Sequence, residues 1–310
     1  DYNQNTNPNN CNMRNLKNWM LAAILICGTT AVLTSCSDQI DNPTPQPEGG
    51  TVDNDLAVMC INGTFIGKKT DNVIIYKGIP FVGQQPVGNL RWKAPVEYTA
   101  DNGVYEAYEY GKGACQPEGV VPSMGEDCLY LNVWKAEDKS DEKKPVMVWI
   151  HGGAFVGGGT GIDLFDCTNL IKENPDVIVV TVAYRLGVMG FLHLSHLADG
   201  KDYPDAQNLG LLDQKMALKW VHENIEGFGG DPDNVTIWGE SAGSASCTLQ
   251  ALIEGSQNYF QKIIAQSGSP AVTRSTEEAI ACTDGIMKAL DCKTVADLLK
   301  IDAKKLVEAA

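Results

Sequence analysis

The sequence predicts an α/β fold with a mostly parallel central sheet flanked by helices, and three observations carry that prediction. Three apolar, β-branched runs lack polar alternation, as is typical of strands buried on both faces of a parallel sheet. A segment of helical periodicity separates the last two runs, and such strand–helix–strand crossovers join parallel strands. With 310 residues, the chain is also long enough for one large domain with a sizeable core.

The expected elements follow one another along the chain. A short strand that ends in a turn is expected within residues 71–80, and the three buried strands are expected at 146–150, 177–183 and 235–238. Apolar residues recur at helical spacing from Leu211 to Ile225, which predicts a helix. A capping box at Ser275 and Glu278 starts further helical sequence. Because residues 304–310 are still helical in pattern, we expect the domain to be truncated at its C-terminus.

The composition excludes some function classes. Hydrophobic residues make up 44% of the chain and charged residues 20%, as in a globular protein rather than a disordered one. The formal charge is −15, and no dense cluster of lysine and arginine occurs. Since such a surface repels phosphate backbones, we expect no nucleic-acid partner.

The N-terminal part of the sequence has the pattern of a targeting signal. Arg14 and Lys17 give a positive start, an uncharged and mostly apolar stretch covers residues 19–33, and small residues precede Cys36. Residues 13–35 thus resemble a bacterial lipoprotein signal peptide. The alternative is a plain secretory signal followed by a chance cysteine.

The lipoprotein resemblance implies a domain organisation and a location. Cys36 would be lipidated, and residues 36–55, rich in proline and glycine, would form a flexible tether. Residues 1–12 would be a non-native segment upstream of the true start, and 56–310 would form the folded domain. We therefore expect an exported cell-envelope lipoprotein of a bacterium, held at the membrane by a lipid anchor at Cys36.

Cysteine and histidine spacing does not indicate a metal site. Ten cysteines and four histidines occur, with no CxxC pair. His193 and His196 are three residues apart, but no third ligand is evident. We expect neither a metal nor a cofactor.

The pentapeptide Gly239-Glu240-Ser241-Ala242-Gly243 matches G-x-S-x-G, between an expected strand and a plausible helix at 244–252. This is the context of a nucleophile elbow, in which a tight turn strains the serine backbone and exposes its hydroxyl above the sheet. The alternative is an ordinary glycine–serine turn. The placement between strand and helix favours Ser241 as a nucleophile.

A second glycine-rich motif, His151-Gly152-Gly153-Ala154-Phe155, follows the apolar run that ends at Ile150. Glycines let backbone N–H groups approach a substrate oxygen, and such donors stabilise the charge of a tetrahedral intermediate. The alternative is a glycine-rich turn without a catalytic role. A phosphate-binding loop is disfavoured because no Gly-Lys-Ser/Thr follows.

These motifs belong to an ordered series, and the chain resembles the type-B carboxylesterase family of α/β-hydrolases, including the para-nitrobenzyl esterases and cholinesterases. The combination of EDCLYLNV at 126–133 with GESAG at 239–243 is the most specific part of the resemblance. The shared stretches are residues 78–82, 86–92, 126–133, 151–155, 184–187, 208–214, 228–232, 239–243 and 266–269.

The resemblance implies a role for each site residue. Ser241 would be the nucleophile, and the oxyanion-hole donors would be the N–H groups of Gly153, Ala154 and Ala242. Gly152 would be a supporting glycine and Glu240 a buried structural carboxylate. Cys115 and Cys128 would form a disulfide.

The sequence departs from the family pattern at two points. Residues 116–127 contain no aromatic side chain, which does not support binding of a quaternary ammonium group. The family's catalytic acid and histidine follow the serine, whereas all four histidines of this chain precede Ser241. We therefore expect both groups to lie beyond residue 310, and this chain to be inactive alone.

The expected function is that of a serine carboxylic ester hydrolase that forms an acyl-enzyme on Ser241 and acts on a small-molecule ester. One alternative is an inactive adhesion or binding homologue, but such relatives typically lose the serine or the oxyanion glycines. The other is a membrane-surface lipase that acts on long acyl chains.

Overall fold

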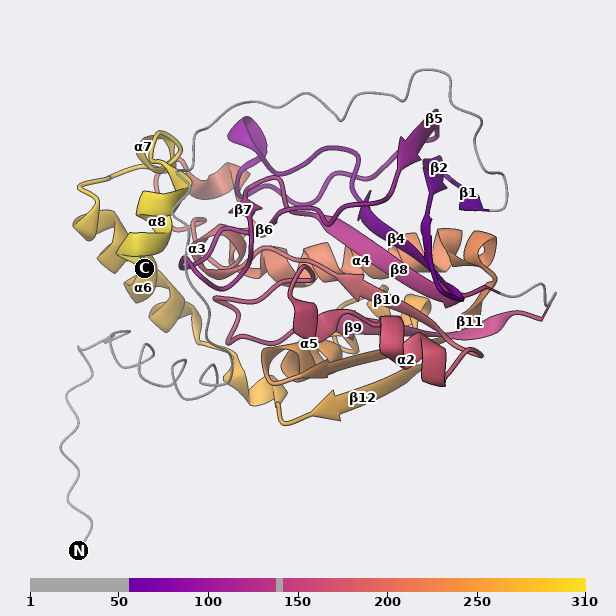
Figure 1. The fold of residues 1–310 in the computed structure, drawn as a ribbon. Coiled ribbons are helices and arrows are strands. Elements are labelled where there is room, and N and C mark those ends of the chain that lie inside the picture. Colours follow the sequence, from indigo (N-terminus) through magenta and orange to yellow (C-terminus); the bar gives the residue numbers. More distant parts are fainter. Residues whose placement is uncertain (1–55, 138–141) are drawn as a thin grey trace, which may run out of the picture. The chain divides into compact units, whose positions relative to one another are not determined.

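The computed structural model of the protein describes residues 56–137 and 142–310 (Figure 1). The expected upstream segment 1–12, signal peptide 13–35 and tether 36–55, with Cys36, lie outside the described residues. In the described part of the chain, no helix combines the length and apolar character needed to cross a membrane.

A seven-stranded sheet forms the centre of the fold, in the order β12-β11-β9-β10-β8-β4-β3. Four strands on one side are parallel, and β8, β4 and β3 continue the sheet in antiparallel fashion. The strands are β3 (Lys68–Thr70), β4 (Val73–Pro80), β8 (Tyr130–Ala136), β9 (Lys144–Ile150), β10 (Ile178–Val182), β11 (Gly230–Glu240) and β12 (Lys262–Gln266). The α/β class is confirmed, and the three expected buried strands are β9, β10 and β11.

Two smaller sheets lie outside the central one. The first joins β1 (Ala57–Cys60), β2 (Asn62–Ile66) and β5 (Asp101–Glu106). The second pairs β6 (Gly113–Ala114) with β7 (Met124–Gly125). Cys115 directly follows β6, and Cys128 lies three residues after β7, so this pairing brings the two segments that carry the cysteines together.

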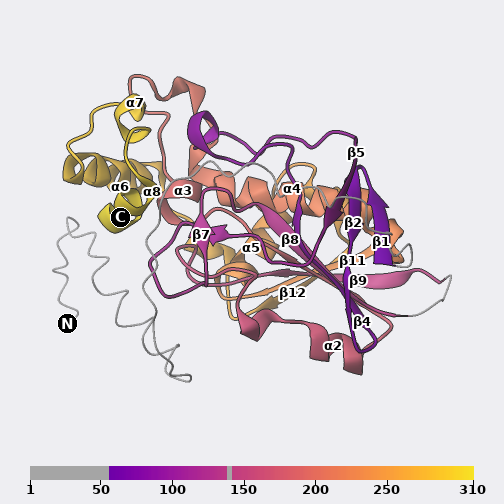
Figure 2. The same ribbon diagram turned by 45° about the horizontal axis from the view of Figure 1, so that its top comes forward.

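Helices cover both faces of the central sheet, as Figures 1 and 2 show. Helices α4 (Leu209–Asn224) and α5 (Ala242–Gln250) lie on one face, and α2 (Thr168–Glu173) lies on the other. Beyond the sheet follow α3 (Gly187–Gly190), α6 (Thr276–Ala289), α7 (Val295–Leu298) and α8 (Ala303–Ala309).

The boundaries of α4 and α5 lie within two residues of the helices expected at 211–225 and 244–252. Helix α4 begins two residues before the expected Leu211 because η6 (Ala206–Asn208) leads directly into it. The capping box at α6 is present: the Ser275 hydroxyl accepts a hydrogen bond from the Glu278 N–H at 3.2 Å, and the Glu278 carboxylate accepts one from the Ser275 N–H at 2.9 Å.

Burial differs sharply between the middle and the edge of the parallel half. All five residues of β10 are buried, whereas all five residues of the edge strand β12 are exposed. The core on the face of α4 and α5 combines alternate residues of β9, β10 and β11 with Trp220 of α4. This packing holds the carboxyl ends of β9 and β11 next to each other.

Candidate active site

Ser241 lies between β11 and α5, in the strand–turn–helix context that the sequence predicts. It is the N-cap residue of α5, with φ 55° and ψ −119°. A non-glycine residue in this region is strained by about 1–3 kcal/mol and persists only when its surroundings enforce it. The strained serine backbone expected of a nucleophile elbow is thus present.

The glycines of the elbow are required by close backbone packing. A Cβ atom on Gly243 would lie 2.0 Å from the carbonyl oxygen of Ile150, at the end of β9. A Cβ atom on Gly239 would lie 2.5 Å from the carbonyl carbon of Gly243. The turn can therefore fold against β9 only if neither position carries a side chain.

Both polar groups of the Ser241 backbone are hydrogen-bonded, whereas its hydroxyl group is not. The Ser241 N–H donates to the Gln266 carbonyl at 2.9 Å, and the Ser241 carbonyl accepts from the Ala245 N–H at 3.0 Å. Within residues 56–137 and 142–310, the hydroxyl makes no hydrogen bond. A partly exposed and unpaired hydroxyl is available to a substrate and to a base.

The two glycine motifs meet at this turn although they are far apart in the chain. A Cβ atom on Gly152 would lie 2.6 Å from the Glu240 carbonyl oxygen and 3.3 Å from the Ser241 Cβ. Past Gly152 the backbone enters the left-handed region at Gly153, Ala154 and Phe155, with φ of 110°, 54° and 60°. The close approach of Gly152 places this turn beside the nucleophile.

The expected oxyanion donors have no partner among the described residues. None of the N–H groups of Gly153, Ala154 and Ala242 donates a hydrogen bond there. Ala242 is the first residue of α5, where backbone N–H groups lack intrahelical acceptors and the helix dipole favours negative charge. These groups can donate to an oxygen that carries negative charge.

Hydrogen bonds from other segments hold the turn in its strained shape. The Tyr184 hydroxyl donates to the His151 carbonyl at 2.7 Å, and the Gly187 N–H donates to the Phe155 carbonyl at 2.7 Å. The His151 ring stacks on Tyr184 with 4.4 Å between centroids. Complete burial lowers the pKa of His151 to about 4, so its ring is neutral at neutral pH.

Arg185 and Asp213 form a buried ion pair that no sequence motif indicates. The Arg185 Nε donates to Asp213 Oδ2 at 2.8 Å and its Nη2 donates to Oδ1 at 2.6 Å. The pair ties the segment after β10 to α4. Both residues lie in the family-like stretches, but no local spacing pairs them.

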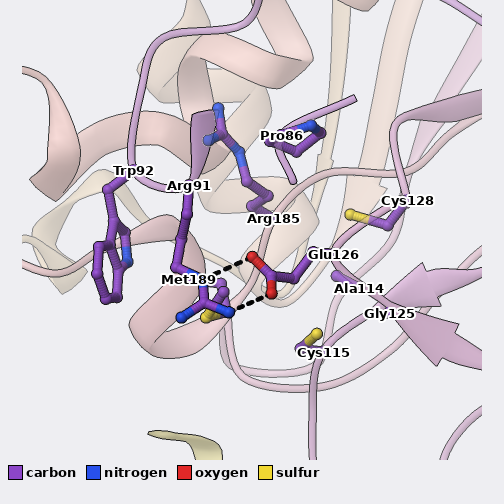
Figure 3. A pocket seen from close by; sticks show the side chains of 10 residues that line it. All are labelled: Pro86, Arg91, Trp92, Ala114, Cys115, Gly125, Glu126, Cys128, Arg185 and Met189. Atoms are coloured by element: carbon purple, nitrogen blue, oxygen red, sulfur yellow. Dashed lines mark hydrogen bonds and ion pairs between the residues drawn. The ribbon is translucent and has the colours of Figure 1, made fainter. Parts of the chain in front are cut away.

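Cys115 and Cys128 are brought to the same small cavity, which Figure 3 shows together with Arg91 and Glu126. The Arg91 guanidinium faces the Glu126 carboxylate and donates to it from Nε at 2.7 Å. Burial and, second, the neighbouring Cys115 raise the pKa of the Cys128 thiol. No disulfide occurs among the described residues, so the expected Cys115–Cys128 bond is not formed in this structure.

The resemblance implies that Glu240 is a buried structural carboxylate, and this role stays a prediction. Glu240 is exposed, and it ends the face of β11 that also carries the partly exposed Thr236 and Trp238. Alternation along the strand directs these residues away from the core formed with α4 and α5. Glu240 pairs in the sheet with Gln266 of the exposed edge strand β12.

The four histidines of the chain make their contacts with residues other than Ser241. His151 is buried in the turn of residues 151–155, the oxyanion turn, and its Nδ1 lies 2.8 Å from the Gly152 carbonyl oxygen. His196 contacts Asp284 at 3.1 Å and His193 contacts Ser195 at 3.2 Å. His222 of α4 lies against Tyr259, with 5.7 Å between the rings. None of them forms a hydrogen bond with Ser241 in the described part of the chain.

The described residues contain no group of three or more histidine, cysteine, aspartate or glutamate side chains arranged to hold a metal ion. The arrangement around Ser241 offers a hydroxyl and three backbone donors instead. Chemically, it can present an oxygen nucleophile to a carbonyl carbon and stabilise negative charge on the carbonyl oxygen.

Comparison with known proteins identifies related chains. A model described as "Carboxylesterase family" matches residues 54–310. The para-nitrobenzyl esterase of Bacillus subtilis (strain 168) is 42% identical over 257 residues, which cover 80% of this chain and 51% of that protein. An acetylcholinesterase of Danio rerio is 37% identical over 250 residues, covering 74% of this chain and 38% of that protein.

Solved structures show the same similarity. A carboxylesterase of Geobacillus stearothermophilus superimposes with a TM-score of 0.77 at 41% identity, covering 82% of this chain and 52% of the other. The chain thus spans about half the length, or less, of the relatives that it matches.

Proposed function

Because the chain belongs to the carboxylesterase family, we propose that the protein is a serine carboxylic ester hydrolase with Ser241 as its nucleophile. The observation that carries the proposal is the meeting of two motifs at one point. The strained Ser241 lies beside Gly152, and the N–H groups of Gly153, Ala154 and Ala242 have no partner among the described residues.

The proposed reaction has two half-reactions with a shared oxyanion site. The Ser241 Oγ attacks the ester carbonyl carbon, its proton passes to a base, and the carbonyl oxygen becomes an oxyanion that the N–H donors stabilise. Collapse breaks the ester C–O bond and the alcohol leaves with the proton. Water then attacks the acyl-enzyme in the same way and releases the carboxylic acid. No metal or other cofactor takes part in these steps.

We propose that the base and its orienting acid lie outside residues 1–310. Support comes from the positions of the four histidines and from the coverage of about half of the relatives. A serine hydroxyl is a weak nucleophile until a base accepts its proton. This chain alone should therefore turn over an ester far more slowly than the complete protein.

The substrate class proposed is a small-molecule carboxylic ester. Intact Ser241 and glycine motifs favour an enzyme over an inactive adhesion or binding homologue. Membrane-surface lipase activity is a different outcome, and comparing turnover of esters with short and long acyl chains separates the two. A preference for the short chains supports the proposal.

Export and anchoring are a further part of the proposal. The signal-like residues 13–35 and the tether 36–55 support a cell-envelope lipoprotein that is held at the membrane through lipid on Cys36. Mass spectrometry should find acyl chains on Cys36, and Cys36→Ala should release the protein from the membrane. In that oxidising location Cys115 and Cys128 would form a disulfide, which peptide mapping can detect.

The test of the proposed function uses the protein expressed from its complete gene. A serine-directed organophosphate should inhibit hydrolysis of a chromogenic short-chain ester and should label Ser241. Labelling of a different residue, or turnover that continues after labelling, would show that Ser241 is not the nucleophile.

A further inference from the structure

Gln116 is a buried amide that the proposed mechanism does not use. Only 3% of the residue is exposed. Its Nε2 donates to the Gly158 carbonyl at 2.8 Å and to the Ala114 carbonyl at 3.0 Å, and its Oε1 accepts from the Gly158 N–H at 2.8 Å. Donor and acceptor of one side chain are thus paired with both polar groups of one glycine.

Gly158 lies directly against the oxyanion turn. A Cβ atom on Gly158, whose φ is 115°, would lie 2.5 Å from His151 Nδ1 and 2.7 Å from the Gly152 carbonyl oxygen. The carbonyl oxygen of Gly157 lies only 1.9 Å from where a Cβ atom on Gly153 would be. The peptide that joins Gly157 to Gly158 therefore packs directly against Gly152 and Gly153.

The turn needs this packing because its backbone is strained. Ala154 and Phe155 have φ of 54° and 60°, which non-glycine residues adopt only when neighbouring structure enforces it. The Gly153 carbonyl accepts hydrogen bonds from the N–H groups of Val156 and Gly157, both at 3.0 Å. These bonds tie the turn to residues 156–157. A shift of Gly158 would be passed to the Gly153 and Ala154 donors.

We infer that Gln116 is a positioning residue for the oxyanion hole: its amide holds Gly158 and thereby the N–H groups of Gly153 and Ala154. The inference rests on the proposed function. Gln116 touches neither substrate nor Ser241, and it acts through Gly158. Only a neutral group with one donor and one acceptor can make this pairing, and glutamine provides both.

The chain offers a matched control in Gln85. Its Nε2 donates to the Leu129 carbonyl at 3.2 Å and its Oε1 accepts from the Leu129 N–H at 2.9 Å. This is the same two-point pairing with one residue, made by a partly buried glutamine, and neither Gln85 nor Leu129 makes a hydrogen bond with residues 151–158 in the described part of the chain. Gln85→Met should reproduce the structural cost of losing such a pairing without its effect on the donors.

The first measurement is steady-state hydrolysis of a short-chain ester by the complete protein. Gln116→Met should lower kcat about 10- to 100-fold, less than the roughly 10²- to 10³-fold loss for removing an oxyanion donor, and leave KM nearly unchanged. A trifluoromethyl ketone forms a tetrahedral adduct with the Ser241 oxygen, and the former ketone oxygen carries the negative charge. Affinity for this inhibitor should fall by a similar factor. Gln85→Met should keep both values near those of the parent.

The second measurement uses pH. In Gln116→Glu, an ionised carboxylate cannot donate to the Gly158 carbonyl, whereas a protonated carboxyl group restores donor and acceptor. The kcat of this variant, divided by that of the parent, should rise as pH falls through the pKa of the buried carboxyl group. The same ratio for Gln116→Met should not depend on pH. The free energy of unfolding of Gln116→Glu, measured at the same pH values, separates this recovery of kcat from a general gain in folded protein.

A third measurement does not depend on activity. Within residues 153–158, amide hydrogen exchange should be at least about tenfold faster in Gln116→Met at Val156, Gly157 and Gly158, whose N–H groups are hydrogen-bonded, while Gln85→Met should affect only the region of Leu129. Unchanged exchange at 153–158, or equal loss of kcat in both variants, would overturn the role of Gln116. If the parent hydrolysed no ester, the proposed function would fail, and the exchange result would still decide whether Gln116 holds the turn.

Discussion

The nucleophile elbow and the oxyanion turn lie side by side, but they are stabilised in different ways. The elbow is shaped by backbone packing: Cβ atoms on Gly239 or Gly243 would overlap main-chain atoms. The oxyanion turn is held by side chains from other segments, among them Gln116 and Tyr184. A short motif therefore contains most of what shapes the elbow, while the support of the turn lies outside its motif.

This difference predicts different sensitivities. The elbow should tolerate no added side chain at its glycines, because main-chain atoms cannot move away as the end of a flexible side chain can. Loss of a single hydrogen bond to the turn from a distant position should lower stability or activity by a smaller amount. Substitutions in the elbow and in the oxyanion turn should therefore differ in the size of their effects.

The largest effect is expected for Ser241→Ala in the complete protein. Removing the nucleophile of a serine hydrolase lowers kcat by about 10⁶-fold, because the acyl-enzyme cannot form. The measurement is turnover of a chromogenic short-chain ester. Ser195→Ala, at an exposed serine that contacts His193, should keep the parent rate. Equal activity of Ser241→Ala and the parent would contradict the assignment.

Gly243→Ala tests the elbow itself. Its Cβ would lie 2.0 Å from the Ile150 carbonyl oxygen, so β9 or α5 must shift. We expect a loss of more than about 3 kcal/mol in the free energy of unfolding, or failure to fold. The control is Gly285→Ala in α6, where a Cβ meets nothing within 4 Å and helix propensity should add up to about 1 kcal/mol. Similar urea midpoints for both variants would contradict backbone packing as the cause.

A pH-dependent loss of stability is expected on the oxyanion side. Burial lowers the pKa of His151 to about 4, below the roughly 6.5 of an unfolded chain. Between these values the unfolded state binds the extra proton, so stability falls as pH decreases from 6.5 to 4, by on the order of 3 kcal/mol. Urea unfolding at several pH values should show this loss in the parent and a smaller one in His151→Gln. Identical pH dependence of both proteins would exclude His151 as its source.

The smallest effect is expected for Tyr184→Phe, which removes the hydrogen bond to the His151 carbonyl and keeps the ring stacking. Loss of one buried hydrogen bond costs about 1–2 kcal/mol of stability. Tyr105→Phe, which loses an exposed contact with Asp101, should change stability by less than about 0.5 kcal/mol. Thermal unfolding measures both, and a larger cost for Tyr105→Phe would reverse the expected order.

Much of the fold on the parallel side could be predicted from the sequence. The buried strands β9, β10 and β11, the helix α4 and the capping box of α6 all follow from local periodicity and end signals. The antiparallel half of the sheet does not, because pairing among β8, β4 and β3 joins segments whose partners no local pattern identifies. The exposure of Glu240 likewise depends on what covers one face of β11, which no local pattern shows.

The strand, the small residues and the helix of the elbow are consecutive, so one motif is enough to predict this turn, although Gly243 must be small because it packs against Ile150 of β9. The approach of Gly152 to Ser241, the pairing of Arg185 with Asp213 and the pairing of Gln116 with Gly158 arise only in the folded chain. These contacts join residues far apart in the chain. Their geometry depends on how β9, β10 and β11 pack together, which no single segment encodes.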